Sequence, residues 1–532
     1  MKLNNESLKN TSFWEKAGIT IPSFDREKMI TATKTAPKWV HFGPGNIFRA
    51  FPAALAQRLL EKGIEKTGII TAEGYDGEII DKCFTPLDNL TISVTLKADG
   101  TTEKQVIASI AASYRMDTEL AALKDFFKAP SLQIASFTIT EKGYSLTGRD
   151  GAFFPDIADD LKTGPTAPKS YLGRIACLLY ERYINGSLPI AMVSMDNCSH
   201  NGDILFAAMN SFAKGWVENG AADAGFLNYI CDKNKVSFPW SMIDKITPRP
   251  DDSVREMLAA SGLEDMQGFV TAKNTYVAPF VNAEETQYLV IEDSFPNGKP
   301  ALDTAGVLFT DRETVDRVEK MKVCTCLNPL HTSLAVFGCM LGYTRISEEM
   351  KDADLVRLIE GVGYTEGLPV VTDPGIIKPR DFIDQVIKVR LPNPFMPDAP
   401  QRIAMDTSLK IPIRFGETLK EYQKAGKNCA EMKFIPLVCA GWLRYLLGIY
   451  DNGNRFEVSP DPQYGALAST LSGITLGQSG PFHDKLRPIL SNPLFFGVNL
   501  YDAGLGEKVE ELFTQMVAGP GAVRKTLNKA AQ

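Results

Sequence analysis

Lys322, Asn328 and His331 bring an amine, a carboxamide and an imidazole together within one short stretch of the chain. Asn328 and His331 are three residues apart and therefore share a face if the stretch is helical. A lysine with a lowered pKa can take a proton from a hydroxyl group, and an asparagine amide can hold the alkoxide that forms. The combination indicates a hydride-transfer site, whereas each residue taken alone has a simpler structural interpretation.

Further polar residues follow elements that look buried. The segment 194–203 comes directly after an apolar strand and is rich in acid, amide and hydroxyl groups, Asp196 and Asn197 among them. Ligands of open α/β sheets bind beyond the carboxyl ends of strands, so this segment is a candidate site. The alternative is a loop in which Asn201 or Asp203 caps the next helix.

Asp244 is one acid in an apolar setting, and the alternative for it is a solvated turn before Pro248. Arg402 and Lys410 are two cations eight residues apart, which could bind a carboxylate or hydroxyl groups. The alternative for this pair is an exposed helix face.

Gly43-x-Gly45 lies between an expected strand and an expected helix, where glycines let a backbone approach a pyrophosphate closely. The third glycine of the full fingerprint is replaced by Phe48, so a plain βα turn is the alternative. After the second strand, Glu73 or Asp76 could accept hydrogen bonds from an adenosine ribose. Such an acid repels a 2′-phosphate, which favours NAD over NADP.

These candidate residues are positioned by an α/β alternation. Strands at 39–42 and 68–73 flank a helix at 47–62, and further strands are expected at 92–97, 105–113, 133–139 and 189–195. Helices are expected at 116–127, 175–184 and 203–217, which together predict a doubly wound, Rossmann-like sheet. After about residue 300 the pattern becomes helical. We predict an N-terminal arm (1–36), an NAD-binding domain (37–305) and a mostly α-helical substrate domain (306–532).

Composition excludes several classes of protein. The 532 residues include 57 Lys+Arg and 64 Asp+Glu, and a net charge of −7 disfavours nucleic acid and anionic membranes as partners. No run is expected to reach the roughly 18 apolar residues of a membrane span. Nine scattered cysteines fit reduced thiols in the cytoplasm. With four histidines and no paired zinc ligands, no metal is expected.

Several ordered blocks together resemble the polyol-specific long-chain dehydrogenases, a family that includes mannitol 2-dehydrogenase, fructuronate reductase and tagaturonate reductase. The blocks are Val40-His-Phe-Gly-Pro-Gly-Asn-Ile-Phe-Arg-Ala50, Thr138-Ile-Thr-Glu-Lys-Gly-Tyr144, Met195-Asp-Asn-Cys-Ser-His-Asn-Gly202 and Tyr288-Leu-Val-Ile-Glu-Asp293. The resemblance implies a zinc-independent, NAD-dependent enzyme whose active site lies between a Rossmann-like domain and a helical domain.

The resemblance also implies residue roles. Lys322 matches the catalytic lysine, Asn197 and Asn328 the oxyanion-holding asparagines, and His331 the site histidine. Substrate contacts are implied for Asp244, Arg402 and Lys410. Cofactor contacts are expected from the loop after the first strand and from acids at two further strand ends, namely Gly43, Gly45, Asn46, Ile47, Phe48, Arg49, Glu73, Asp76 and Asp196.

The chain departs from the family in two ways. Six steps separate Lys322 from Asn328, where the family has five, and Pro329 replaces a glycine. One extra residue turns a side chain by about 100° on a regular helix, so either a π-bulge absorbs it or the lysine is displaced.

Arg402, Lys410 and either Lys388 or Arg390 could bind a carboxylate, which favours D-mannonate/D-fructuronate interconversion by a monomer or small homo-oligomer. The alternatives are a polyol or tagaturonate enzyme, a non-catalytic dinucleotide-binding protein, and a metal-dependent hydrolase that uses His200, Asp203 and His331.

Overall fold

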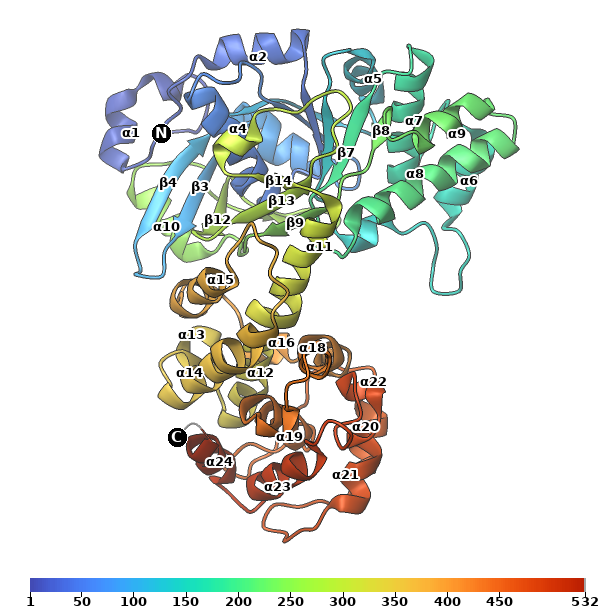
Figure 1. Cartoon of the computed structure of the whole chain (residues 1–532). Helices are drawn as coiled ribbons and strands as arrows, with labels where there is room; N and C mark the ends of the chain where they lie inside the picture. Colours follow the sequence, from blue (N-terminus) through green and yellow to red (C-terminus); the bar gives the residue numbers. More distant parts are fainter. Residues whose placement is uncertain (531–532) are drawn as a thin grey trace. The chain divides into compact units, whose positions relative to one another are not determined.

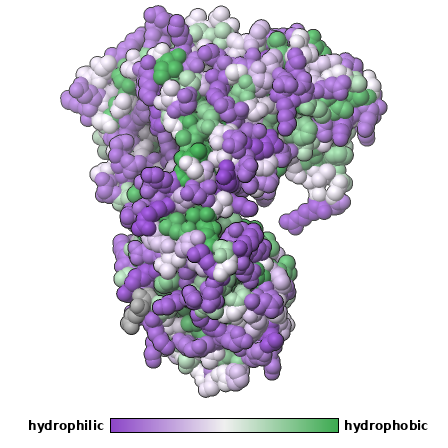
Figure 2. All heavy atoms as spheres, in the orientation of Figure 1, coloured by the Kyte–Doolittle hydropathy of each residue, from purple (hydrophilic) through white to green (hydrophobic). Residues whose placement is uncertain are grey.

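The computed structural model describes residues 1–530, which divide into two compact units (Figure 1). The first unit comprises Met1–Lys97 and Thr101–Val315, and the main segment of the second begins at Asp316. The division falls inside a helix, α11 (Arg312–Met321), about ten residues after the boundary expected from the sequence. On the face drawn in Figure 2, hydrophilic residues predominate on the surface of each unit.

The first unit is built on a six-stranded sheet in the order β5-β2-β1-β6-β7-β8. All its paired strands run parallel. The order reverses between β1 and β6, which creates the crevice where such sheets bind ligands. This confirms the predicted doubly wound sheet. Its strands are β1 (Trp39–Phe42), β2 (Ile69–Glu73), β5 (Ile110–Arg115), β6 (Ile134–Phe137), β7 (Ile190–Ser194) and β8 (Val236–Ser237).

Alternation along the strands sends neighbouring side chains to opposite faces, and each face has its own core. Val40 and Phe42 pack with α5, α7 and α8, whereas Trp39 and Ile69 pack with α4.

The helices of this unit are η1 (Ser7–Lys9), α1 (Thr11–Ala17), α2 (Arg26–Thr35), α3 (Asn46–Ala50), α4 (Pro52–Glu61), η2 (Ile80–Phe84), η3 (Thr85–Leu87), α5 (Leu120–Lys128), η4 (Glu141–Tyr144), α6 (Pro155–Thr163), α7 (Tyr171–Ile184), α8 (Asn201–Glu218), α9 (Ala224–Cys231), α10 (Asp252–Ala260) and η5 (Leu302–Ala305).

Smaller sheets flank the main one and were not expected from the sequence. Their orders are β12-β3-β4, β14-β13-β9 and β10-β11. The single strand expected at 105–113 is two strands, because the chain turns between β4 and β5. The strands are β3 (Thr91–Leu96), β4 (Thr102–Ile107), β9 (Ser241–Asp244), β10 (Phe269–Val270), β11 (Tyr276–Val277), β12 (Phe280–Glu284), β13 (Tyr288–Glu292) and β14 (Leu308–Thr310).

The first 36 residues, expected to be an arm, form helices that bury Trp14 and Met29. The expected helix at 47–62 is broken at Phe51 into α3 and α4, since Phe51 leaves the helical conformation (φ −128°, ψ −73°).

The second unit is helical throughout its described part, as the loss of strand-like pattern predicts. Its helices are η6 (Lys322–Cys326), α12 (Asn328–Leu341), α13 (Ile346–Glu349), α14 (Ala353–Glu360), η7 (Gly361–Gly367), η8 (Leu368–Val370), α15 (Pro379–Gln385), η9 (Val386–Arg390), α16 (Pro400–Ile403), α17 (Thr407–Ile411), η10 (Pro412–Gly416), α18 (Glu417–Lys424), η11 (Cys429–Glu431), α19 (Phe434–Tyr445), α20 (Tyr464–Thr470), α21 (His483–Leu490), α22 (Pro493–Phe496), α23 (Gly506–Met516) and α24 (Ala522–Ala530). Of these, η6, η7, η9 and η10 are π-helical.

One helical stretch corrects the expectation that no segment is long and apolar enough to span a membrane. Residues Arg312–Leu341 contain an 18-residue window of mean hydropathy 1.3. In the structure 72% of that window is buried inside the protein, which is typical of a core helix.

Candidate active site

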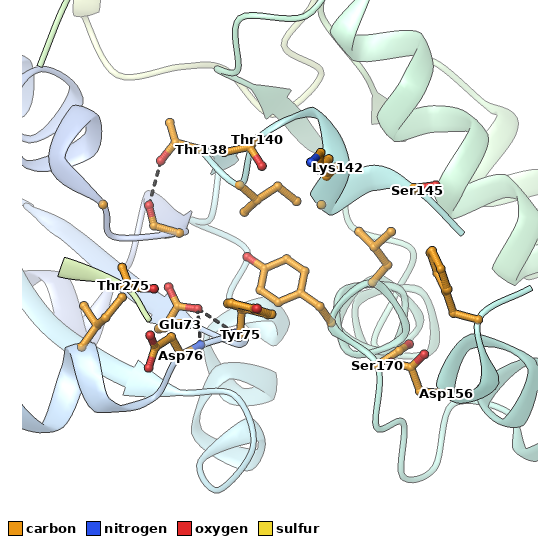
Figure 3. Close-up of a pocket in the computed structure, with 18 of the residues that line it drawn as sticks. Glu73, Tyr75, Asp76, Thr138, Thr140, Lys142, Ser145, Asp156, Ser170 and Thr275 are labelled. Atoms are coloured by element: carbon orange, nitrogen blue, oxygen red, sulfur yellow. Dashed lines mark hydrogen bonds between the residues drawn. The ribbon is translucent and has the colours of Figure 1, made fainter. Parts of the chain in front are cut away.

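A cavity of about 640 Å³ lies in the first unit at the carboxyl ends of three neighbouring strands. It is lined by Gly43 and Gly45 after β1, by Glu73 and Asp76 at the end of β2, and by residues 138–145 after β6. Figure 3 shows Thr138, Thr140 and Lys142 on one side of the cavity and Glu73, Asp76 and Thr275 on another. The cavity therefore lies at the switch point of the sheet, where the sequence predicts a dinucleotide.

The two glycines of the loop after β1 have different functions. Gly43 has a φ of +87°, and a Cβ on it would lie 2.4 Å from the carbonyl oxygen of Thr138. A side chain at Gly45 would meet nothing within 4 Å, although Gly45 lines the cavity. Gly43 thus allows the tight turn. Gly45 leaves space in the cavity beside the backbone, where a pyrophosphate could bind.

Glu73 and Asp76 both line the cavity, and each carries a hydrogen bond that fixes its position. Glu73 Oε1 accepts the backbone N–H groups of Tyr75 (2.6 Å) and Asp76 (3.0 Å). Asp76 Oδ2 accepts the hydroxyl of Thr271 at 2.6 Å. Burial raises the pKa of the Glu73 carboxyl, against the opposing effect of those N–H groups. Two oxygen acceptors at the end of β2 suit the hydroxyls of a ribose.

Four of the predicted cofactor residues have side chains that contact other parts of the protein, namely Asn46, Ile47, Phe48 and Arg49. Phe48 is buried and stacks on His41, with ring centroids 3.9 Å apart. The Arg49 guanidinium is buried and donates to Ala278 O (2.8 Å), to Thr91 Oγ1 and to Asn46 Oδ1. Only the backbone of Phe48 and Arg49 is left for a cofactor contact, and the Asn46 side chain is used to hold Arg49. Ile47, between Asn46 and Phe48, packs against the apolar core on the α4 face of the sheet.

Asp196, also predicted to contact the cofactor, is a support for the cavity wall. Its carboxylate accepts the backbone N–H groups of Ile139 and Thr140, both at 2.9 Å, and the Tyr144 hydroxyl at 2.6 Å. Burial raises the pKa of the Asp196 carboxyl, although these three donors oppose the shift.

Sequence reasoning named no individual side chain of the wall formed by residues 138–145, and it did not single out Tyr171, Phe154 or Thr275. The block Thr138–Tyr144 was noticed only as part of a family pattern. The placement of Tyr171 at the first turn of α7, and of Thr275 next to β11, carries no local sequence signal.

Asn197 and Asp244 both belong to this unit. Asn197 is exposed just beyond β7, and Asp244 is buried at the end of β9. The Asn201 amide donates to Asp196 O (3.0 Å) and Ser241 O (2.9 Å). These bonds link the segment just after β7 to the start of β9. The predicted cap is therefore wrong: the cap position of α8 is His200, and the Asn201 side chain bridges to β9. The solvated-turn alternative for Asp244 is also wrong.

Lys322 begins the π-helix η6. The N–H of Leu327 donates to the carbonyl of Lys322 at 3.0 Å. The two residues are five positions apart, which is the spacing of a π-helical hydrogen bond. A π-turn therefore lies between Lys322 and Asn328, which is the form in which the sequence analysis expected an extra residue to be accommodated. Asn328 and Pro329 open α12, and the cap position is Leu327.

His331 follows one turn later on α12, within a group of basic residues of the second unit. Its Nε2 lies 3.6 Å from Asp398 Oδ2, outside hydrogen-bond distance. The pKa of His331 is lowered to about 4. Burial is the main cause, the charges of Arg414, Arg402 and Arg390 act in the same direction, and Asp398 opposes the shift. The imidazole is therefore neutral at physiological pH.

Arg402 and Lys410 belong to the same group. Arg402 forms an ion pair with Asp398, and its side chain is 60% exposed. Lys410 Nζ donates to Ile403 O (3.0 Å) and Met405 O (2.5 Å), and burial lowers its pKa to about 8. Sequence reasoning missed Arg414, which binds the Thr332 hydroxyl and contacts Asn328 O, and it missed Asp398.

The residues considered for a metal site have other partners in the structure. His200 stacks on Trp240 with ring centroids 4.0 Å apart, and Asp203 pairs with Arg312 at 3.1 Å. Among residues 1–530, no group of three or more His, Cys, Asp or Glu side chains is arranged to hold a metal ion.

With the fold and these two groups of residues established, the chain can be placed among known proteins. The family model described as the mannitol dehydrogenase Rossmann domain matches residues 37–304, and the mannitol dehydrogenase C-terminal domain matches residues 314–487. The chain belongs to the mannitol dehydrogenase family, as the sequence blocks predicted.

Individual relatives agree with this assignment. The D-mannonate oxidoreductase of Thermotoga maritima is 52% identical over 99% of both chains. The mannitol 2-dehydrogenase of Pyrenophora tritici-repentis is 28% identical over 92% of this chain and 81% of that protein. Among solved structures, the Pseudomonas fluorescens mannitol 2-dehydrogenase ternary complex with NAD and D-mannitol is 26% identical over 99% of both chains, with a TM-score of 0.69. A substrate-free D-sorbitol dehydrogenase is 25% identical over 97% of both chains, with a TM-score of 0.79.

Proposed function

We propose that this protein is an NAD-dependent oxidoreductase that interconverts D-mannonate and D-fructuronate. The observation that carries the proposal is the 52% identity to a D-mannonate oxidoreductase over 99% of both chains. The matched region covers the stretches of chain that form both the nucleotide cavity and the basic group around His331.

The residues of the first unit fit an NAD molecule. Gly45 leaves space beside the start of α3, and Glu73 and Asp76 offer acceptors for ribose hydroxyls. The same acids repel the 2′-phosphate of NADP. When bound, NAD supplies the carbon that accepts the hydride.

In the oxidation direction, Lys322 Nζ takes the proton of the substrate hydroxyl. The Asn197 and Asn328 amides donate to that oxygen as negative charge develops on it. Asn328 is held by the Arg414 contact at its carbonyl, and His331 orients a neighbouring hydroxyl as a neutral imidazole. Asp244 accepts from another substrate hydroxyl. Reduction follows the same steps in reverse.

The substrate carboxylate distinguishes a sugar acid from a polyol, and the basic group of the second unit provides suitable donors. The positive charges of Arg414, Arg402 and Arg390 act on His331 against one carboxylate, that of Asp398, so positive charge predominates around the imidazole. Lys410 lies near Arg402 and Arg414 and also near the carboxylates of Asp406 and Asp461. Cations in such surroundings favour an anionic substrate group.

The proposal is tested by steady-state assays of the purified chain with D-mannonate and D-mannitol plus NAD, and with D-fructuronate and D-fructose plus NADH. We expect kcat/KM for the sugar acid to exceed that for the matching polyol by at least about a hundredfold. Activity should persist after chelation. A preference for mannitol or fructose would instead assign the chain to the polyol enzymes, and tagaturonate is the further sugar acid to compare.

A non-catalytic dinucleotide-binding protein is the second candidate function, favoured only by the insertion after Lys322. It would show NADH binding without turnover of any hexuronate or polyol. For either function we propose a cytoplasmic monomer or small homo-oligomer that acts on a small molecule, without nucleic-acid or membrane partners.

A further inference from the structure

We propose that Asp196 is a positioning residue: its carboxylate holds the wall of the nucleotide cavity in a strained conformation that the wall would otherwise leave. The inference rests on the proposed NAD-binding function, because the cavity is the site whose shape the carboxylate maintains. It changes the role of Asp196 from cofactor contact to support.

The strain is located at Thr140, which lines the cavity. Thr140 has φ +67° and ψ 159°, a backbone region used almost only by glycine. Thr140 also carries a β-branched side chain, for which positive φ is a genuine outlier. The wall therefore keeps this geometry only because its surroundings impose it.

Asp196 makes the bonds that impose the geometry. Oδ1 accepts the N–H of Thr140 itself, and Oδ2 accepts the N–H of Ile139 and the hydroxyl of Tyr144, at the two ends of the strained segment. The Tyr144 hydroxyl also lies 2.8 Å from Ser194 Oγ, in the strand that leads to Asp196. Both carboxylate oxygens are thus engaged with the wall, and the buried group makes hydrogen bonds of the stronger, charge-assisted kind.

The position of Asp196 in the chain gives the arrangement a second consequence. Asp196 immediately precedes Asn197, the proposed oxyanion-holding amide, and its own carbonyl accepts a hydrogen bond from Asn201. One residue therefore fixes both the cofactor wall after β6 and the start of the segment that carries Asn197 after β7. Loss of the carboxylate should loosen the wall more than the amide, since Asn201 still holds the backbone of Asp196.

The experiment is a double-mutant cycle on Asp196→Asn and Thr140→Gly in the full-length protein. In Asp196→Asn, one oxygen becomes an NH2 donor, so one of the two backbone N–H groups loses its acceptor in either amide orientation. We expect the Kd for NADH, measured by fluorescence titration, to rise about tenfold or more, with a parallel rise of KM for NAD and a smaller fall in kcat.

Thr140→Gly should restore affinity, because glycine adopts φ +67° without strain and needs no clamp. In the Asp196→Asn background we expect the Kd for NADH to fall at least about fivefold. Thr140→Gly in the wild-type background supplies the reference corner of the cycle, and the fall in Kd should be larger in the Asp196→Asn background than in the wild-type background. A merely structural role for Asp196 would lower the melting temperature without this rescue.

Ser187→Gly is the matched control, because Ser187 also has positive φ (51°) but does not line the cavity. It should leave the Kd of both backgrounds unchanged. Should Asp196→Asn fail to fold, Tyr144→Phe removes one donor and keeps both N–H bonds, and a rise in Kd of about two- to fivefold is expected.

An unchanged Kd in Asp196→Asn, or equal rescue by Ser187→Gly, would overturn the inference. Absence of NADH binding by the wild-type protein would instead overturn the proposed function. The two failures are therefore distinguishable.

Discussion

The two units place charged residues by different structural means. In the first unit, Glu73 is the last residue of the parallel strand β2, where sheet register fixes its position, and Asp76 lies three residues beyond it. In the second unit, Lys322, Arg390 and Arg414 each lie on a separate π-helical turn, in η6, η9 and η10. The first group is acidic and the second basic.

This difference has a physical reason. A strand end in a parallel sheet is placed by many ladder hydrogen bonds, so an acid there needs only a local N–H or hydroxyl to orient it. A helix offers no such edge, and one extra residue in a π-turn re-aims a side chain without ending the helix. Helical sites of this kind accommodate insertions that would shift a strand out of register.

The largest expected effect follows from removal of the amine that we propose as the catalytic base. Lys322→Ala should lower kcat by at least about a thousandfold, because no other group is proposed to take the hydroxyl proton. The Kd for NADH, which depends on the first unit, should change less than about threefold. Lys320→Ala, two residues earlier and exposed, is the matched control. Unchanged turnover would reject Lys322 as the base.

Removing a cation of the second unit should affect the substrate alone. Arg402→Gln is expected to raise KM for D-mannonate about ten- to thirtyfold, since a charged hydrogen bond to the carboxylate is lost. KM for NAD should remain within about twofold in steady-state assays. Arg357→Gln, a surface arginine that also pairs with an aspartate, controls for general loss of charge. An equal rise in both KM values would contradict the division of tasks between the units.

Removing an acid of the first unit should affect the cofactor alone. Asp76→Ala is expected to raise KM for NAD several-fold and to increase kcat/KM with NADP about tenfold, because the 2′-phosphate no longer meets that carboxylate. The substrate KM should not change. Asp81→Ala, in the neighbouring π-helix η2, provides the comparison. Persistent exclusion of NADP would assign discrimination to Glu73.

The smallest expected effect concerns the buried histidine of each unit. Burial lowers the pKa of His41 to about 3 and that of His331 to about 4, both below the unfolded value of about 6.5. The unfolded chain therefore binds more protons below pH 6.5, and each histidine makes the protein less stable as the pH falls through that window. His331→Gln should reduce the loss of melting temperature between pH 7 and pH 4.5 by a few degrees.

Calorimetry at both pH values measures this effect. His483→Gln is the control, because His483 is 42% exposed. An acid response identical to that of the wild-type protein would mean that His331 is not held neutral by the folded second unit.

The order of residue types along the chain predicted those parts of the fold and site that are formed by neighbouring segments. The glycine turn after β1 and the acids after β2 could be found because strand, turn and helix follow one another within about 35 residues. The π-turn at Lys322 was anticipated only from a count of residues against a family pattern. Asp398 and Arg414 were missed, since their approach to His331 depends on the tertiary packing of α12 against α16 and η10.

The role of Asp196 was also out of reach, because Thr140 gives no sign in the sequence of its positive φ. Phe48 and Arg49 were assigned to the cofactor on their place in the loop, whereas burial decides where their side chains lie. A pattern of residue types identifies which elements meet at a site, but not which side chains face it.

The stacked rings of His41 and Phe48 bear on how such chains are detected. The usual third glycine lets the first helix approach the sheet closely, and here an aromatic pair fills that contact instead. The spacing between strand and helix is thus maintained by ring thickness rather than by the absence of a side chain. Searches that demand three glycines will pass over proteins with this substitution, even when their sheets bind the same coenzyme.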